Sequence, residues 1–258
     1  MYKVSYDLHI HSCLSPCGDE DMTPGNIVGM AAIKELNVIA LTDHNSSRNC
    51  PPFLKHAECF GIIAIPGMEL CTREEVHVLC LFEELQGALE FDTFVYEKLF
   101  KVHNNEEIFG RQLLINERDE VSGKEEYLLV NAADIGFDEV YELVKTYEGI
   151  MIPAHIDKSS NSLLSNLGFI PPDSRFTCAE ATCKEAVSIS GLSPAKAAGF
   201  SKEEEAMAEL KRKNPYLQNC RIINNSDAHY LEHIHEPVHF LQIEEMNRKG
   251  ILKALVNP

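Results

Sequence analysis

Short apolar segments alternate with helix-like segments along most of this 258-residue chain, and this alternation constrains the fold more than any other feature. Strands that alternate with helices are typical of α/β proteins. The strand-like segments are residues 4–10, 38–42, 62–65, 76–82, 150–154, 177–181, 221–224 and 238–243. The helix-like segments are residues 23–36, 52–60, 91–102, 137–147, 202–213 and 244–256. The sequence therefore predicts an α/β architecture.

One stretch interrupts the alternation. Residues 111–131 contain two strand-like runs, QLLINERDEV and KEEYLLV, on either side of Ser122 and Gly123, which predicts a β-hairpin that turns at those two residues. No repeat or low-complexity linker divides the chain. We expect a single domain over residues 1–258 with a β-hairpin insertion at 111–131. A lid over a site and a surface ornament are both open interpretations of that insertion.

Histidines and carboxylates recur at the ends of the strand-like segments. In parallel βα architectures the carboxyl ends of the strands meet at one rim, where catalytic groups gather. Imidazole and carboxylate ligands without thiolate suit zinc, manganese or iron. These positions predict a metal site, and in chain order they are His9, His11, Asp43, His44, Glu69, His77, His155, Asp227 and His229.

A second histidine motif, near the C-terminus, has a different interpretation. Residues 235–239 read HEPVH and match H-E-x-x-H, the zinc-protease pattern, which requires a helix so that both histidines share a face. Pro237 would disrupt a helix interior, and the following residues are typical of a strand. On a strand, His235 and His239 would lie about 13 Å apart, too far to share one ion. The motif therefore does not predict a protease.

Six short motifs occur in a fixed order: DLHIHS, ALTDHN, PGMEL, EVHVL, IPAHID and NSDAH. Together they resemble the PHP (polymerase and histidinol phosphatase) superfamily over roughly residues 5–230. The resemblance implies a distorted (β/α)7 barrel, similar to a TIM barrel, with the small hairpin as an insertion. It also implies three divalent metal ions (Zn, Mn or Fe) at the carboxyl-terminal face of the strands.

The resemblance implies a ligand set as well. Glu69 would bridge the first ion, bound by the histidines of H-x-H and by Asp227, to a second ion bound by His77 and His155. A third ion would be bound by His44, His229 and an acid from the first loop. The full set of implied metal ligands is His9, His11, Asp19, His44, Glu69, His77, His155, Asp227 and His229.

The acid from the first loop is the least certain member of that set. The loop reads SCLSPCGDEDMTP and is longer than in simpler members of the superfamily. Counting back four residues from Thr23 gives Asp19, and Glu20 and Asp21 are the alternatives.

The implied activity is the hydrolysis of a phosphate ester, in which a metal-bound hydroxide attacks phosphorus. The substrate would be a small phosphomonoester, a nucleotide or a short oligonucleotide. In this hypothesis Glu69, Asp227 and His229 are catalytic. Three cations near strand ends are candidates for substrate binding, with a solvated surface charge as an equal alternative for each: Arg73, Lys158 and Arg175.

Three other functions are compatible with the same residues. The first is a PHP phosphodiesterase that acts as a 5′–3′ exonuclease. The second is a C–N hydrolase of the amidohydrolase type, which is disfavoured because no strand presents an obvious lysine. The third is a regulatory metal-binding barrel without turnover, which is disfavoured because the ligand set is intact.

The acidic composition bears on partners and location. Lys and Arg total 23 against 40 Asp and Glu, a net charge of −17. Such a charge repels polyanions, so we expect a small phosphorylated substrate and no long duplex nucleic acid. No apolar run reaches the roughly 18–20 residues of a membrane span, and the N-terminus MYKVSYDLHIHS lacks a signal-peptide core. Nine scattered cysteines suit a reducing compartment, so we expect a cytoplasmic protein without a membrane partner.

Overall fold

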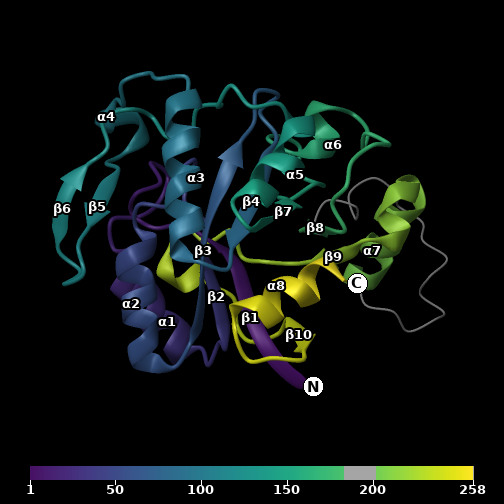
Figure 1. Cartoon of the computed structure of the whole chain (residues 1–258), viewed down its shortest axis with the longest axis horizontal. Coiled ribbons are helices and arrows are strands. Elements are labelled where there is room, and N and C mark those ends of the chain that lie inside the picture. The colour runs from purple at the N-terminus through teal and green to yellow at the C-terminus, as the bar shows by residue number, and fades with distance from the viewer. Residues whose placement is uncertain (183–201, 258) are drawn as a thin grey trace.

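The computed structural model describes residues 1–182 and 202–257, and its central feature is a curled sheet surrounded by helices (Figure 1). Six strands form this sheet in the order β10-β1-β2-β3-β4-β7. A separate parallel pair, β8 and β9, contacts the sheet beside β7. The strands are β1 (Tyr2–Ile10), β2 (Val38–Leu41), β3 (Ile63–Cys71), β4 (His77–Phe82), β7 (Gly149–Pro153), β8 (Cys178–Glu180), β9 (Arg221–Ile223) and β10 (Phe240–Ile243).

The strands do not all run in one direction. β1, β2 and β3 are parallel, whereas β4 is antiparallel to both β3 and β7 and β10 is antiparallel to β1. A short turn joins β3 to β4 without a helix. The α/β class predicted from the sequence is confirmed, and the curled sheet is consistent with the predicted distorted barrel. Helices do not alternate regularly with the described strands, because β4 follows β3 directly.

Hydrogen bonds between loops join the two sheets into a distorted barrel. Ile10 at the end of β1 pairs with Ala228 through an isolated parallel bridge. On the other side, the Ile156 amide donates to the carbonyl of Glu180 at 2.9 Å. One buried apolar cluster includes side chains from β1, β2, β3, β4, β7, β8 and β9, so these strands share a common interior.

Helices cover the outside of the barrel and close its lower end in Figure 1. Thr23 caps the first helix by accepting a hydrogen bond from the Asn26 amide, and Pro24 occupies the first turn. No helix among residues 1–182 and 202–257 is long and apolar enough to cross a membrane. The helices are α1 (Pro24–Ile33), α2 (Cys50–Phe60), α3 (Leu85–Lys98), α4 (Glu106–Phe109), α5 (Phe137–Thr146), α6 (Leu163–Asn166), α7 (Lys202–Lys213) and α8 (Arg248–Val256), with 3₁₀ turns η2 (Pro215–Asn219) and η3 (Leu231–His233).

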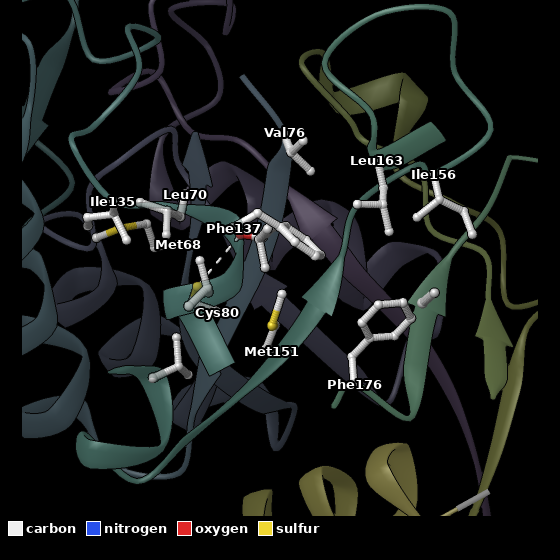
Figure 2. Close-up of a cluster of buried hydrophobic side chains, with 14 of the residues drawn as sticks. Met68, Leu70, Val76, Cys80, Ile135, Phe137, Met151, Ile156, Leu163 and Phe176 are labelled. Carbon is white, nitrogen blue, oxygen red and sulfur yellow. Dashed lines mark hydrogen bonds between the residues drawn. The ribbon is translucent and has the colours of Figure 1, made fainter. Parts of the chain in front are cut away.

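A second core lies between the sheet and the helices on its outer face. Met68 of β3 and Cys80 of β4 pack here against Phe137 of α5 and Met151 of β7 (Figure 2). Phe176, which precedes β8, belongs to the same cluster. Burial of these side chains fixes α5 against β7 and thereby fixes the loop that follows β7.

The hairpin insertion consists of β5 (Leu113–Ile115) and β6 (Val121–Lys124), which are antiparallel. Its turn lies at residues 116–120, so the prediction of a turn at Ser122 and Gly123 is wrong. The Asn116 side chain accepts hydrogen bonds from two amides inside this turn, those of Arg118 and Glu120. Such an Asx turn reverses the chain without glycine. The Leu113 amide donates to the Cys13 carbonyl, which holds the hairpin against the first loop.

The segment before β10 also differs from its prediction. β10 begins at Phe240, and residues 237–238 form a turn. The rings of His235 and His239 therefore lie 5.0 Å apart rather than about 13 Å. In the part of the chain that the structure describes, neither histidine belongs to a group of three possible metal ligands.

Candidate metal centre

The topology brings the chemistry-bearing strand ends to one rim of the barrel. β1, β2, β3 and β7 end at this rim, and the antiparallel β4 begins there. The antiparallel direction of β4 is the reason that His77, its first residue, meets residues at the ends of the other strands. The residues gathered at the rim are His9, His11, His44, Glu69, His77, His155, Asp227 and His229.

Glu69 lies at the centre of this group and is almost completely buried. Its Oε1 is 2.9 Å from His77 Nδ1 and 3.0 Å from His155 Nε2. Its Oε2 is 2.9 Å from His44 Nδ1. The Nε2 atoms of His9 and His11 lie slightly farther away, at 3.3 and 3.4 Å. One carboxylate therefore faces five imidazoles, with different imidazoles on each oxygen.

Asp227 forms the second acidic centre and lies nearer to solvent. Its Oδ1 is 3.3 Å from the Nε2 atoms of both His9 and His11, which are themselves 3.1 Å apart. The side chains of Asp227 and His229 are 18% and 22% exposed, whereas the other ligand candidates at the rim are buried. The centre is therefore accessible from the side of Asp227 and His229.

Ligand atoms converge in three groups, in each of which they lie within 4.8 Å of one another. Within the described chain, two buried atoms that lie 2.9 Å from each other, Nδ1 of His44 and Oε2 of Glu69, have no hydrogen-bond partner. Unpaired lone pairs that face one another are costly in a dry site unless a cation lies between them. The donor set thus fits divalent metal ions, and the groups are His9–His11–Asp227, His44–Glu69–His77 and His11–His44–His229.

The electrostatics of the centre favour added positive charge. Burial opposes ionisation of Glu69, but the imidazoles of His77 and His9 outweigh it and hold the pKa of Glu69 well below its usual range. Burial lowers the pKa of His77, yet the Glu69 carboxylate raises it to about 10. Burial and the neighbouring His229 instead hold the pKa of His11 well below its ordinary value. Metal binding would therefore replace protons held by this carboxylate–imidazole network.

Two of the ligand candidates have unusual backbones. His155 and Asp227 adopt φ values of 29° and 53°, in the left-handed region that non-glycine residues rarely occupy. Such conformations cost about 1–3 kcal/mol each and persist where the surroundings impose them, often at functional sites. Both residues lie in the loops that follow strands β7 and β9, where these conformations accompany the side chains that meet at the rim.

The first loop passes the centre at Asp19, but the described contacts of its acids are with other groups. The Asp19 amide donates to the His229 carbonyl at 2.9 Å, but its carboxylate accepts from the Asp21 amide. Glu20 pairs with Arg111 of the insertion. In the described structure, His11 rather than an acid of this loop accompanies His44 and His229.

The three predicted substrate-binding cations have different surroundings. The Lys158 ammonium contacts Oδ2 of Asp227, directly at the centre. Arg73 instead pairs with Asp134 at 2.7 Å, and Arg175 pairs with Glu142 on α5. Of the three, the described contacts bring only Lys158 to the metal centre.

Two residues of the site, Glu180 and Ser15, were not assigned from the sequence. Glu180 accepts a hydrogen bond from His9 Nδ1 at 3.0 Å. Ser15 Oγ lies 3.0 Å from His11 Nδ1 and donates to the buried Asp43 at 2.7 Å. A signal for Glu180 was available, because it ends a predicted strand just as the other acids do. Ser15 had no comparable signal.

These features define a class of protein, a distorted α/β barrel with clustered imidazole and carboxylate side chains that could bind metal at its rim. The chain belongs to the PHP domain family, whose pattern matches residues 7–165. This confirms the resemblance found in the sequence. Members of the family include metal-dependent phosphoesterases and nucleases.

Two curated proteins match part of the chain. An uncharacterized protein of Methanocaldococcus jannaschii is 35% identical over 92 residues, which cover 32% of this chain and 54% of that protein. The 5′–3′ exoribonuclease Rnm of Salmonella typhimurium is 32% identical over 85 residues, 31% of this chain and 28% of the enzyme. The matches thus span about half of the first protein and little more than a quarter of the second.

Among solved structures, the lesion-specific endonuclease Q of Pyrococcus furiosus has a similar fold. It matches with a TM-score of 0.64 and 20% identity, over 98% of this chain and 56% of the endonuclease. At this identity the likeness concerns the fold alone. The distorted barrel is thus a fold that this endonuclease also contains.

The expectation of no long duplex nucleic acid is wrong. Endonuclease Q was also crystallised with a 27-mer duplex that places an abasic lesion at the active site, and that structure matches this chain with a TM-score of 0.58. The prediction failed because net charge averages over a whole surface, whereas polyanion binding depends on the local arrangement of cations.

Proposed function

We propose that this chain hydrolyses phosphate esters with divalent metal ions bound at the rim of the barrel. One observation carries the proposal: a buried group of imidazoles and carboxylates converges around Glu69, and among its described members Asp227 and His229 are the most exposed to solvent. The proposed ligands are His9, His11, His44, Glu69, His77, His155, Asp227 and His229, with Asp19 as a further candidate beside His229.

Bound divalent ions supply Lewis acidity to a phosphoryl group and lower the pKa of a coordinated water. The chain's own residues provide the rest of the site. Glu69 contributes one oxygen to each side of the centre, which suits a bridging ligand. His229 can donate from Nδ1 to the Asp227 carbonyl at 2.8 Å, which would leave its Nε2 lone pair free.

Lys158 is the proposed phosphate-binding residue. Its side chain is 38% exposed and its ammonium lies at Asp227, on the open side of the centre. A cation at this edge can pair with a phosphate oxygen that approaches from solvent. Since Asp227 is also a proposed ligand, Lys158 would link substrate binding to the occupied centre.

The test is a hydrolysis screen with protein that has been stripped of metal and then loaded with Zn²⁺ or Mn²⁺. The substrates are phosphorylated metabolites, mononucleotides, dinucleotides, single-stranded oligonucleotides and duplexes with and without an abasic lesion. Phosphate-ester cleavage that requires added metal and disappears in Glu69→Gln supports the proposal. Cleavage of amide substrates alone, or no turnover of any ester by fully loaded protein, contradicts it.

A second candidate, 5′–3′ exonucleolytic cleavage of RNA, is favoured by one observation. The matching 85 residues of the Salmonella enzyme are 32% identical to this chain. Oligoribonucleotides labelled at the 3′ end would distinguish the two activities. Stepwise release of mononucleotides from the 5′ end supports the exonuclease, whereas removal of a terminal phosphate alone supports a phosphomonoesterase.

A further inference from the structure

Glu180, the last residue of β8, is a buried acid that the proposed mechanism does not use. Its two oxygens accept from three donors on three different segments. Oε2 accepts from His9 Nδ1 at 3.0 Å and from the Asn225 side-chain amide at 2.7 Å. Oε1 accepts from the His155 backbone amide at 3.0 Å and lies 3.2 Å from His9 Nδ1.

These contacts show that Glu180 is not itself a ligand candidate. Both oxygens are engaged by donors, and the His9 nitrogen that Glu180 contacts is Nδ1, which is not the nitrogen that faces Glu69 and Asp227. Its position is one step outside the centre, behind His9. Outer carboxylates of this kind fix the tautomer and the ring orientation of metal-bound histidines.

The contact with His9 determines which nitrogen faces the centre. An imidazole that donates from Nδ1 to a carboxylate keeps its lone pair on Nε2. The Nε2 atom of His9 is the one that lies 3.3 Å from both Glu69 and Asp227. Glu180 therefore holds His9 in the tautomer and orientation that direct a lone pair at the proposed ion.

The contact with His155 acts through the backbone. His155 has a φ of 29°, and its amide donates to Glu180. This hydrogen bond helps to hold the strained conformation in which His155 Nε2 lies 3.0 Å from Glu69 Oε1. The Nε2 atoms of His9 and His155 both face Oε1 of Glu69, and the two rings stack with centroids 5.8 Å apart, so one outer residue positions two neighbouring ligand candidates.

We propose that Glu180 is a positioning residue that sets the metal affinity of the centre at Oε1 of Glu69, through its contacts with His9 and His155. This inference rests on the proposed metal-dependent function. It concerns how tightly the ions are bound rather than what the protein hydrolyses.

The contact between Glu180 and Asn225 allows a double variant in which the acid and the amide exchange positions. Its Oδ1 accepts from the Leu8 amide at 2.9 Å while its amide group donates to Glu180. In the double variant Glu180→Gln/Asn225→Asp, Gln can keep its oxygen toward His9 and His155 and donate its amide to the new Asp. The hydrogen bonds to the His155 amide and to the side chain at position 225 are preserved, and the negative charge moves away from His9. His9 Nδ1 exchanges its 3.0 Å contact with Oε2 for the 3.2 Å contact with the remaining oxygen. In Glu180→Gln alone, two amide groups oppose each other and the arrangement is broken.

The experiment measures Zn²⁺ affinity and stoichiometry by competition with a chromophoric chelator, together with urea unfolding of the metal-free proteins. We expect Glu180→Gln to lose about 10- to 100-fold in affinity. Glu180→Asp, which keeps the charge but shortens the reach, should lose a similar factor. The double variant should regain about tenfold, because residues that share one hydrogen-bond network are energetically coupled. Glu244→Gln, an exposed change of the same type, should bind Zn²⁺ like the unmodified chain.

Unchanged affinity in Glu180→Gln would overturn the proposal. So would a double variant as weak as the single one, because charge rather than position would then matter. If Glu180→Gln does not fold, Glu180→Asp and the double variant give the same comparison. Failure of the hydrolytic function is a separate outcome, namely an unmodified protein that binds Zn²⁺ with the expected dependence on Glu180 but cleaves no phosphate ester.

Discussion

Replacement of Glu69 by Gln tests the centre most directly. The side chain keeps its shape, but the carboxylate that lies within 3.4 Å of five imidazole nitrogens loses its charge. Removing one partner from a buried charge network costs about 3–5 kcal/mol. That cost corresponds to about 10²- to 10⁴-fold in affinity. Because the two oxygens face different imidazoles, the loss should affect more than one ion.

The assay is elemental analysis after dialysis at a fixed concentration of free Zn²⁺. Glu69→Gln should lose more than one ion per chain and its metal-dependent turnover. His229→Ala is the matched comparison, because His229 belongs to one convergent group only, and it should lose about one ion. Equal losses in the two variants, or full metal content in Glu69→Gln, would show that Glu69 does not bridge.

Three further results are expected. Lys158→Ala should raise KM for a phosphate ester about tenfold, because it removes one charge-assisted hydrogen bond, and it should leave the Zn²⁺ content unchanged. A change in kcat with constant KM would contradict a role of Lys158 in phosphate binding. Chelation of the metals should lower Tm by about 5–10 °C relative to protein in a metal concentration of 100 times the Kd, because binding adds about 2.7 kcal/mol to the free energy of unfolding. Calorimetry with and without chelator measures this shift. Zn²⁺ affinity should rise from pH 6 to pH 8, because the pKa of His77 is raised to about 10 and an ion must displace its proton. Calorimetric titrations in two buffers measure the released protons, and an affinity that does not depend on pH would contradict this expectation.

How well the bounds of helices and strands could be predicted from the sequence differed from one segment to another. The bounds of α7 agree with the prediction of 202–213, and the strand ends that carry His9 and His155 were found because apolar runs ended at charged residues. β3 was predicted to end at residue 65, but it continues to Cys71. Pro66 and Gly67 resemble a turn signal, whereas here the strand passes from parallel pairing with β2 to antiparallel pairing with β4 at these residues. A Cβ at Gly67 would lie 2.8 Å from Leu81, so glycine is needed for this close approach.

Helix α3 was harder to predict. The sequence predicts a helix over 91–102, while α3 spans Leu85–Lys98. Its first turn contains Gly87, which lowers helix propensity but allows close packing, since a Cβ there would lie 2.5 Å from the Tyr147 carbonyl. The close packing of Gly87 against Tyr147 thus outweighs the low helix propensity of glycine. The same limit applies to Asp19 and Glu180, whose roles depend on which neighbours the fold supplies rather than on their own segments.

The seam between β9 and β1 has a consequence for the internal motions of the protein. Within the described chain, one isolated bridge, Ile10 to Ala228, and a few loop hydrogen bonds join these two strands. His9 and His11 lie on one side of this seam and Asp227 lies on the other, so an ion bound by all three would hold the two strands together. Backbone amides along the seam should therefore exchange with deuterium slowly in the loaded protein and much faster after metal removal. The amides of β2 and β3, which are paired on both edges, should change little.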